Sequence, residues 1–150
     1  MGTRYAGAAH EVRALDACLK LVRAAQSVVT RAYRHLAAEN LTVSQFGAME
    51  VLFHVGPMCQ RDLGLKLFRS GGNVTMVVDN LGKRNLVTRT RVPDNRRMMK
   101  VELTPAGRKL VQRLLPRHVE AVVAEMSILS PAEQEHLGRL CRRVGLREGR

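Results

Sequence analysis

The side chains best suited to chemistry in this sequence are the basic ones between residues 58 and 100. This stretch holds ten Lys or Arg residues against three Asp, a local balance of +7 out of a formal net charge of +12. Such a density of positive charge is typical of a surface that binds nucleic-acid phosphates. Catalytic patterns are missing: there is no GxSxG, phosphate-loop or GxGxxG motif, no paired carboxylates and no HxxxH pair. We therefore expect a nucleic-acid-binding protein that is not an enzyme, with no cofactor and no metal site.

Two short helices and a β-hairpin are expected to carry this charge. Ser70-Gly71-Gly72 predicts a turn between the helices. In the second helix the valines and leucine from Val74 to Leu81 fall on one side, so the other side is free to contact a partner. The β-prone runs 86–92 and 98–103 flank the turn-forming sequence PDNRR. This order of elements predicts a winged helix-turn-helix.

The free side of the second helix carries the residue types that read base edges. Asn73 can pair bidentately with adenine, and Thr75 and Met76 offer apolar contact to a thymine methyl. The alternative is that they form an ordinary solvated helix face, and that the hairpin arginines likewise only solvate the hairpin. Besides these three, the residues expected at double-stranded DNA are Gln60, Arg61, Lys66, Arg69, Ser70, Gly72, Arg89, Arg91, Asn95, Arg96 and Arg97.

The rest of the chain reads as helices. Apolar residues recur in a 3,4 alternation over 12–36, which predicts one long helix with a seam for pairing with a second copy of the chain, or else an intramolecular core helix. Helix starts are predicted at the capping boxes Thr42–Gln45 and Ser130–Glu133 and at Thr104-Pro105. Pro116 is expected to kink or split the helix that contains it.

Composition narrows the class of protein further. A chain of 150 residues fits one domain, and its 3% aromatic content argues against base stacking on single-stranded nucleic acid. The sequence shows no signal peptide and no membrane-spanning run. Three cysteines without CxxC spacing fit a reducing compartment. We therefore predict a cytoplasmic protein with no membrane partner.

Four segments together resemble the MarR-type transcriptional regulators. They are LTVSQFGAMEVL (41–52), RDLGLKLFRSGGNVTMVVDNLGKRNLV (61–87), PDNRR (93–97) and VELTPAG (101–107). The resemblance implies a mainly α single domain over 1–150 with a small β-hairpin wing. Its DNA-binding lobe would span about 41–104, and its dimerisation helices about 10–39 and 105–147. It also implies a homodimer that binds an inverted-repeat operator, usually as a repressor.

The resemblance also suggests how such a regulator would be released from DNA. Family members respond to a small molecule or to cysteine oxidation, and Cys18 lies near the position of the reactive cysteine in the peroxide-sensing branch. Cys59 is a second candidate because a helix N-terminus lowers a thiol pKa, although both cysteines can instead be inert. The residues equivalent to a pocket for a small aromatic effector, or else plain core, are His35, Phe46, Met49, Phe53, Leu114 and His118.

At the hairpin tip the resemblance assigns a minor-groove contact and a buttressing role to Arg96 and Arg97. The chain departs from the family pattern here, since Asn95 and Val92 stand where Asp is usual and Asp94 is the acidic residue nearby. The alternative function is that of a basic architectural protein that binds nucleic acid without sequence specificity.

Overall fold

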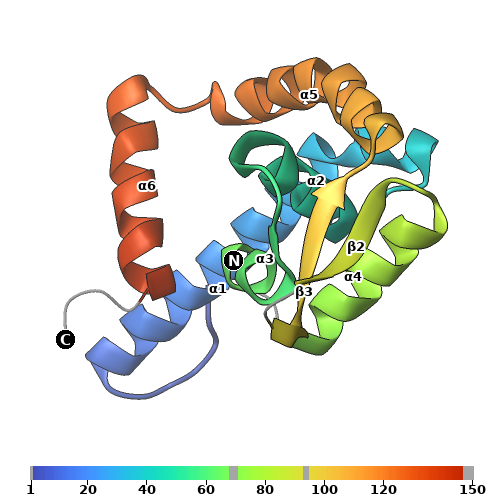
Figure 1. Ribbon diagram of the computed structural model, residues 1–150. Helices are drawn as coiled ribbons and strands as arrows, with labels where there is room; N and C mark the ends of the chain where they lie inside the picture. Colours follow the sequence, from blue (N-terminus) through green and yellow to red (C-terminus); the bar gives the residue numbers. More distant parts are fainter. Residues whose placement is uncertain (1, 68–70, 93–94, 147–150) are drawn as a thin grey trace. The chain divides into compact units, whose positions relative to one another are not determined.

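The computed structural model of the chain describes residues 2–67, 71–92 and 95–146, with the backbone alone at residues 71, 72, 92 and 95–97. The elements in order are α1 (Ala9–Ala32), η1, a 3-10 helix (Arg34–Glu39), α2 (Val43–Val55), β1 (Met58–Cys59), α3 (Gln60–Lys66), α4 (Gly71–Lys83), β2 (Val87–Val92), β3 (Asn95–Leu103), α5 (Pro105–Met126) and α6 (Pro131–Leu146) (Figure 1). The chain divides into two compact units, residues 35–118 and residues 1–34 with 119–150. The predicted mainly α fold with a small β wing is confirmed.

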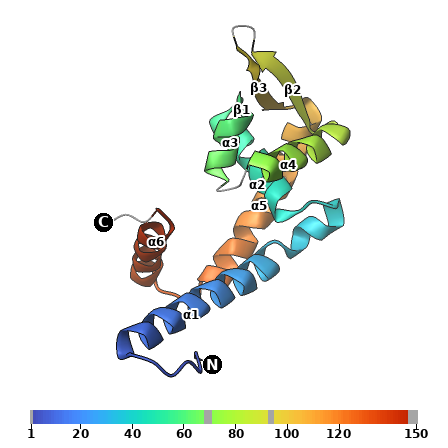
Figure 2. The ribbon, with the colours of Figure 1, turned by 90° about the horizontal axis from the view of Figure 1, so that it is seen from below.

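In the unit of residues 35–118, helices pack with a small sheet around one apolar core. Within the described residues three strands form an antiparallel sheet in the order β1-β3-β2, and the β2-β3 hairpin is the predicted wing (Figure 2). The two-residue strand β1, which pairs Met58 with Val101, was not predicted. The fully buried side chains of this core include Phe46, Leu52, Leu63, Val74, Val78, Leu81, Val101 and Val111.

The helix starts follow the predicted capping chemistry. Gln45 N–H donates to Thr42 Oγ1 at 3.1 Å and Thr42 N–H donates to Gln45 Oε1 at 2.9 Å, which completes the capping box of α2. Ser130 and Glu133 form the second box at α6, and the hydrogen bonds from the Ser130 backbone and side chain lower the pKa of Glu133. Gly107 N–H donates to Thr104 Oγ1 at the start of α5. Both predicted capping boxes are therefore confirmed.

Two arginines fasten η1 to the rest of its unit. Arg113 makes a bidentate pair with the Glu39 carboxylate at 2.8 and 2.9 Å, and this hydrogen bonding lowers the pKa of Glu39 and raises that of Arg113. Arg84, which follows α4, donates to the carbonyl oxygens of Glu39 and Asn40 at 2.9 Å each. The basic residue Arg84 therefore has a structural role.

The expected end of the first helix and the expected split at Pro116 are both wrong. The first helix does not continue to residue 36, because α1 ends at Ala32 and η1 follows, with His35 and Leu36 buried in the other unit. Pro116 does not split α5, which runs unbroken from Pro105 to Met126. Pro116 is exposed. Proline has no N–H to donate to the carbonyl one turn earlier in the helix. Because Pro116 is on the exposed side, water can donate a hydrogen bond to that carbonyl instead.

The unit of residues 1–34 and 119–150 contains α1 and α6 and keeps much apolar surface exposed. Arg31 of α1 pairs with Glu125 at 2.6 Å. Every residue of α6 from 131 to 146 is exposed. The exposed large apolar side chains of α1 and α6 are Leu15, Leu19, Leu21, Val22, Val29, Leu137, Leu140, Val144 and Leu146. Among the described helices, none is apolar over enough length to cross a bilayer.

Candidate nucleic-acid interface

The helix α4 has the two-sided character that its sequence predicts. Val74, Val78 and Leu81 are at most 1% exposed and anchor it in the core. On its other side Asn73 and Thr75 are exposed, and the Met76 side chain is 58% exposed. An exposed methionine is an apolar group that water does not stabilise, so this face is suited to contact a partner.

A hydrogen bond joins the start of α3 to this face of α4. Gln60 Nε2 donates to Thr75 Oγ1 at 2.9 Å, so two predicted DNA-contacting residues bind each other. The bond fixes the orientation of the Thr75 side chain before any partner arrives. Gln60 therefore positions the Thr75 side chain through this hydrogen bond, in addition to the phosphate contact predicted for Gln60 itself.

The predicted DNA-contacting residue Arg89 is paired within the protein. Arg89 Nη1 lies 2.6 Å from Asp79 Oδ1, and both side chains are partly exposed, at 37% and 39%. The pair connects β2 of the wing with α4. It fixes the base of the wing relative to the helix and also neutralises a carboxylate that would face a polyanion.

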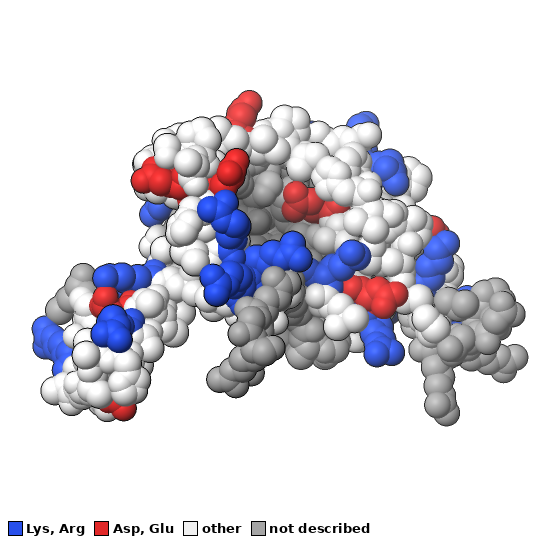
Figure 3. Space-filling view, turned by 90° about the vertical axis from the view of Figure 1, so that its left-hand side faces the viewer, with Lys and Arg blue, Asp and Glu red and all other residues white. Residues whose placement is uncertain are grey.

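Several other cations of the stretch remain available to a partner. Within the described residues, the exposed side chains of Arg61, Lys66, Lys83 and Arg91 have no ion-pair partner, whereas Lys100 lies 3.8 Å from Glu102. Positive charge is also present in the other unit, where α6 carries three arginines. Lys and Arg side chains gather near the centre of the face drawn in Figure 3. The unpaired cations of α3, α4 and β2 are the ones that belong to this interface.

Some predicted contact residues lie outside what the structure describes. Arg69 and Ser70 are outside the described residues. For Gly72, Asn95, Arg96 and Arg97 only the backbone is described, at the start of α4 and in β3. Their contacts with DNA remain predictions.

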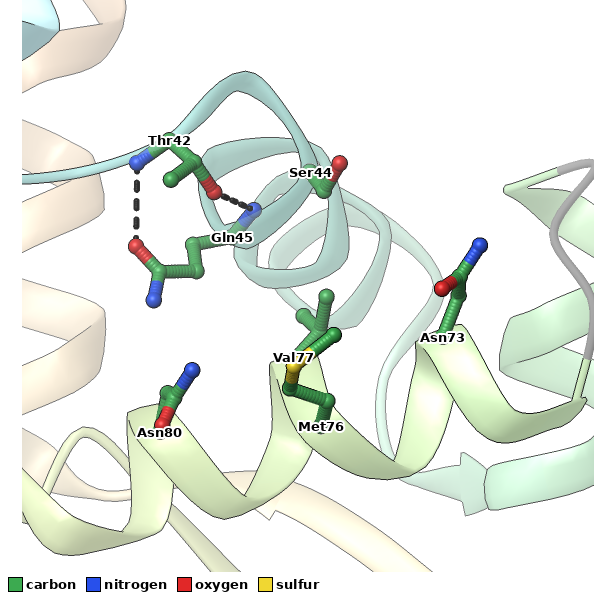
Figure 4. Close-up of a pocket in the computed structure, with 7 residues that line it drawn as sticks. All are labelled: Thr42, Ser44, Gln45, Asn73, Met76, Val77 and Asn80. Atoms are coloured by element: carbon green, nitrogen blue, oxygen red, sulfur yellow. Dashed lines mark hydrogen bonds between the residues drawn. The ribbon is translucent and has the colours of Figure 1, made fainter.

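A pocket beside α4 contains residues that the sequence reasoning missed. A cavity of about 300 Å³ lies between the start of α2 and α4 (Figure 4). Its lining residues are Thr42, Ser44, Gln45, Asn73, Met76, Val77 and Asn80. The spacing from Asn73 to Asn80, two helical turns on one face, was the available signal. Thr42 and Gln45 were interpreted only as helix-capping residues.

Five of the six residues proposed for an effector pocket are buried in the core of their unit. Phe46 and Met49 are fully buried, and the Phe46 ring centroid lies 4.9 Å from that of His118 and 6.3 Å from that of His35. Burial is the main cause that lowers the pKa of the His118 imidazole, while the charge of Glu50 opposes it. Leu114 is also nearly buried.

Phe53 is placed differently from the other residues proposed for that pocket. It is half-buried, and its ring meets His54 and lies 5.4 Å from the Arg108 guanidinium carbon. The structure therefore brings His35, Phe46 and His118 together but gives Phe53 neighbours of its own. Within the described residues, no group of three or more His, Cys, Asp or Glu side chains could hold a metal ion.

The two candidate redox cysteines have different surroundings. Cys18 is exposed on α1, whereas Cys59 is half-buried at the N-cap position of α3, as its sequence position predicts. The Cys59 side chain accepts no capping hydrogen bond. Neither cysteine is bonded to another cysteine in the structure. Their role in oxidation sensing remains a prediction.

A helix-turn-helix with a β-hairpin wing and a surface of unpaired cations defines a winged-helix DNA-binding protein. Comparison with known proteins makes the assignment more specific. Residues 41–99 match the family model described as the MarR family. The regulator MhqR of Bacillus subtilis (strain 168) is 29% identical over 134 residues, which cover 89% of this chain and 92% of MhqR.

Two solved structures agree with this match. A probable transcriptional regulator from Pseudomonas aeruginosa is 31% identical, with a TM-score of 0.73 over 83% of this chain and 92% of that one. BpsR of Bordetella bronchiseptica is 28% identical, with a TM-score of 0.77 over 83% and 89% of the two chains. The chain belongs to the MarR family and is a MarR-family transcriptional regulator.

Proposed function

We propose that this protein is a homodimeric, sequence-specific DNA-binding regulator that acts as a repressor at an inverted-repeat operator. The observation that carries the proposal is the exposed face of α4, where Asn73, Thr75 and Met76 stand beside unpaired cations of α3 and the wing. A helix of this kind enters the major groove with its first residues at the base edges. The cations would hold the phosphates and fix the register of the helix on the duplex.

The exposed apolar side chains of α1 and α6 support the homodimer. These helices leave leucines and valines 37% or more exposed within their own unit, including Leu19, Val22, Leu140 and Val144. A second copy of the chain would cover them and supply the second recognition helix of a two-fold pair. Sedimentation equilibrium should give twice the chain mass, and Leu140→Asp should shift the protein toward monomer. A monomeric wild type that still selects an inverted repeat would contradict this step.

Selection of bound sequences from a random duplex pool tests the DNA proposal directly. We expect enrichment of an inverted repeat whose half-site centres are about 10 base pairs apart, because two-fold related helices enter successive major grooves. Competition with excess random DNA separates the regulator from an architectural binder, which would not retain the selected site. A pool that shows no enrichment would refute sequence-specific binding.

The wing is tested separately. Arg96→Ala and Arg97→Ala should each weaken binding roughly tenfold without changing the melting temperature. The salt dependence should become less steep by about 2 in the slope, because the dimer loses one phosphate contact per subunit. Arg117→Ala on α5, which also removes an exposed arginine but lies outside the wing, is the matched control. Equal affinity of both arginine variants and the wild type at low and at moderate salt would contradict a wing contact.

We propose that a small aromatic effector or oxidation of Cys18 or Cys59 releases the protein from DNA. BpsR supports the first route, since 6-hydroxynicotinic acid regulates its DNA binding. The candidate pocket residues of this chain are His35, Phe46 and His118 with their buried neighbours. Binding to the selected operator should be measured with 6-hydroxynicotinic acid, and separately with hydrogen peroxide. Unchanged operator binding under both treatments would refute the two routes as tested.

A further inference from the structure

The pocket between α2 and α4 is lined by five polar residues together with Met76 and Val77, and none of the lining side chains is charged. Its lining comes from the first turn of α2, namely Thr42, Ser44 and Gln45, and from one face of α4 (Figure 4). Among the described residues, the side chains of Ser44, Asn73 and Asn80 have no hydrogen-bond partner. A cavity of about 300 Å³ with these three polar side chains in its wall can receive a group that offers several acceptors.

The start of α2, which lines this pocket through Thr42, Ser44 and Gln45, also has backbone donors without acceptors. The capping box satisfies the N–H groups of Thr42 and Gln45, and the Phe46 N–H donates to the Thr42 carbonyl. The N–H groups of Val43 and Ser44 have no acceptor within the described residues. Because α2 has 13 residues, these first-turn donors also carry the positive end of its helix dipole.

Gln45 adds a side-chain donor that is held in place. The residue is only 8% exposed, and its Oε1 is fixed by the hydrogen bond from Thr42 N–H. The amide nitrogen Nε2 has no acceptor among the described residues, and Figure 4 shows it on the side of the amide that faces α4. Because this donor is held in place and has no acceptor among the described residues, a ligand with an accepting oxygen can bind it without first ordering the side chain.

We propose that this pocket binds a phosphate of the DNA backbone through Gln45 Nε2 and the free N–H groups of Val43 and Ser44. The proposal rests on the proposed function, because Asn73 and Met76 of the same pocket belong to the face assigned to the major groove. That groove is about 12 Å wide, so a backbone runs directly beside a helix lying in it. None of the lining residues is acidic, and the net charge of +12 favours an anion.

Gln45→Glu tests the assignment while keeping the helix cap. Glutamate is as good a capping-box partner as glutamine, so the variant should melt like the wild type. It replaces the Nε2 donor with a negatively charged oxygen and should weaken binding to the selected operator and to random DNA alike, each on the order of tenfold. Gln112→Glu, an exposed position of α5 in the same unit, makes the same change of charge away from the pocket. This control should bind within about twofold of the wild type.

Val43→Pro is a second variant that removes one of the backbone donors. Proline is well suited to the first helical position, and the chain already uses Thr104-Pro105 in this way. Binding should weaken on the order of tenfold to a hundredfold because one hydrogen bond to a charged group is lost. A Val43→Pro variant with wild-type stability and wild-type affinity would contradict the role of this N–H group.

Operators with single methylphosphonate substitutions identify the phosphate. At one position in each half-site, the substitution neutralises the phosphate that sits in the pocket. It should lower the operator affinity of the wild type there. The affinity of Gln45→Glu should stay the same or rise. Identical methylphosphonate profiles for both proteins, or equal affinities of Gln45→Glu and Gln112→Glu, would overturn the proposal. Failure of the wild type to select any sequence would instead refute the proposed function, so the two failures are distinguishable.

Discussion

Replacing Gly107 with alanine should destabilise the protein through a backbone clash. A Cβ atom at this position would lie 2.0 Å from the Leu86 carbonyl oxygen and 2.9 Å from its carbon, whereas ordinary contacts begin near 3.4 Å. Because the clashing atoms belong to the backbone, no side-chain rotation relieves them. Leu86 or the first turn of α5 must move by more than 1 Å. The wing enters α5 at this junction.

The cost follows from the hydrogen bonds that meet there. Thr104 N–H donates to Leu86 O at 3.1 Å, Thr104 Oγ1 donates to Asn85 O at 2.7 Å, and Gly107 N–H donates to Thr104 Oγ1 at 2.9 Å. Overpacking costs about 1–3 kcal/mol, and each hydrogen bond lost about 1 kcal/mol. We expect a loss of about 2–4 kcal/mol in the free energy of unfolding. This corresponds to a melting temperature lower by roughly 5–15 °C.

Gly82→Ala is the matched control for this prediction. A Cβ at Gly82, inside α4, meets nothing within 4 Å, so alanine should stabilise the helix by up to about 1 kcal/mol. Thermal unfolding followed by circular dichroism should show opposite shifts for the two variants. All samples need the same protein concentration, since a dimer melts in a concentration-dependent way. Equal shifts of Gly82→Ala and Gly107→Ala, or a Gly107→Ala variant that melts with the wild type, would refute the clash argument.

Three further predictions concern the interface, the core and the cysteines. If Arg89 serves only to hold Asp79, then Arg89→Ala and Asp79→Ala should change the free energy of unfolding equally, by about 0.2–1 kcal/mol. A far greater loss of DNA affinity in Arg89→Ala than in Asp79→Ala would instead show a phosphate contact. Burial lowers the pKa of His118 below its usual 6.5, so His118 takes up a proton at a higher pH in the unfolded chain than in the folded one. The melting temperature should therefore fall as the pH drops from 8 to 5. The fall should be less steep in His118→Gln. If Cys59 is a peroxide sensor, its alkylation rate should exceed that of free cysteine, and Cys59→Ser should abolish any effect of peroxide on DNA binding. If Cys18 is the sensor, Cys18→Ser should abolish that effect instead.

Local chemistry explains which parts of the fold were predictable. The capping boxes at Thr42 and Ser130 are formed by residues three positions apart, so their sequence alone specifies the helix starts. The buried side of α4 follows from the spacing of Val74, Val78 and Leu81, because helical periodicity determines which residues share a face. The hairpin was predictable from β-prone runs beside a turn.

Features that depend on distant partners were not predictable in this way. The strand β1 exists because Met58 and Cys59 meet β3 some forty residues later, and two residues carry no strand pattern. The end of α1 at Ala32 reflects the burial of His35 and Leu36 in the other unit, which interrupts a sequence that is otherwise well suited to a helix. Exposure of Pro116 to water similarly decides whether α5 tolerates it.

The candidate interface shows the same division at the level of single side chains. Asn73, Thr75 and Met76 were identified because their neighbours have to be buried, which leaves them outside. Gln45 was missed because its capping role seemed to account for it, although that role uses only Oε1 and the backbone N–H. The amide nitrogen Nε2 takes no part in the cap, and only the fold shows that it faces α4. A capping glutamine beside a recognition helix therefore holds a donor at a fixed place, where a glutamate cap would present an acceptor and repel the same phosphate.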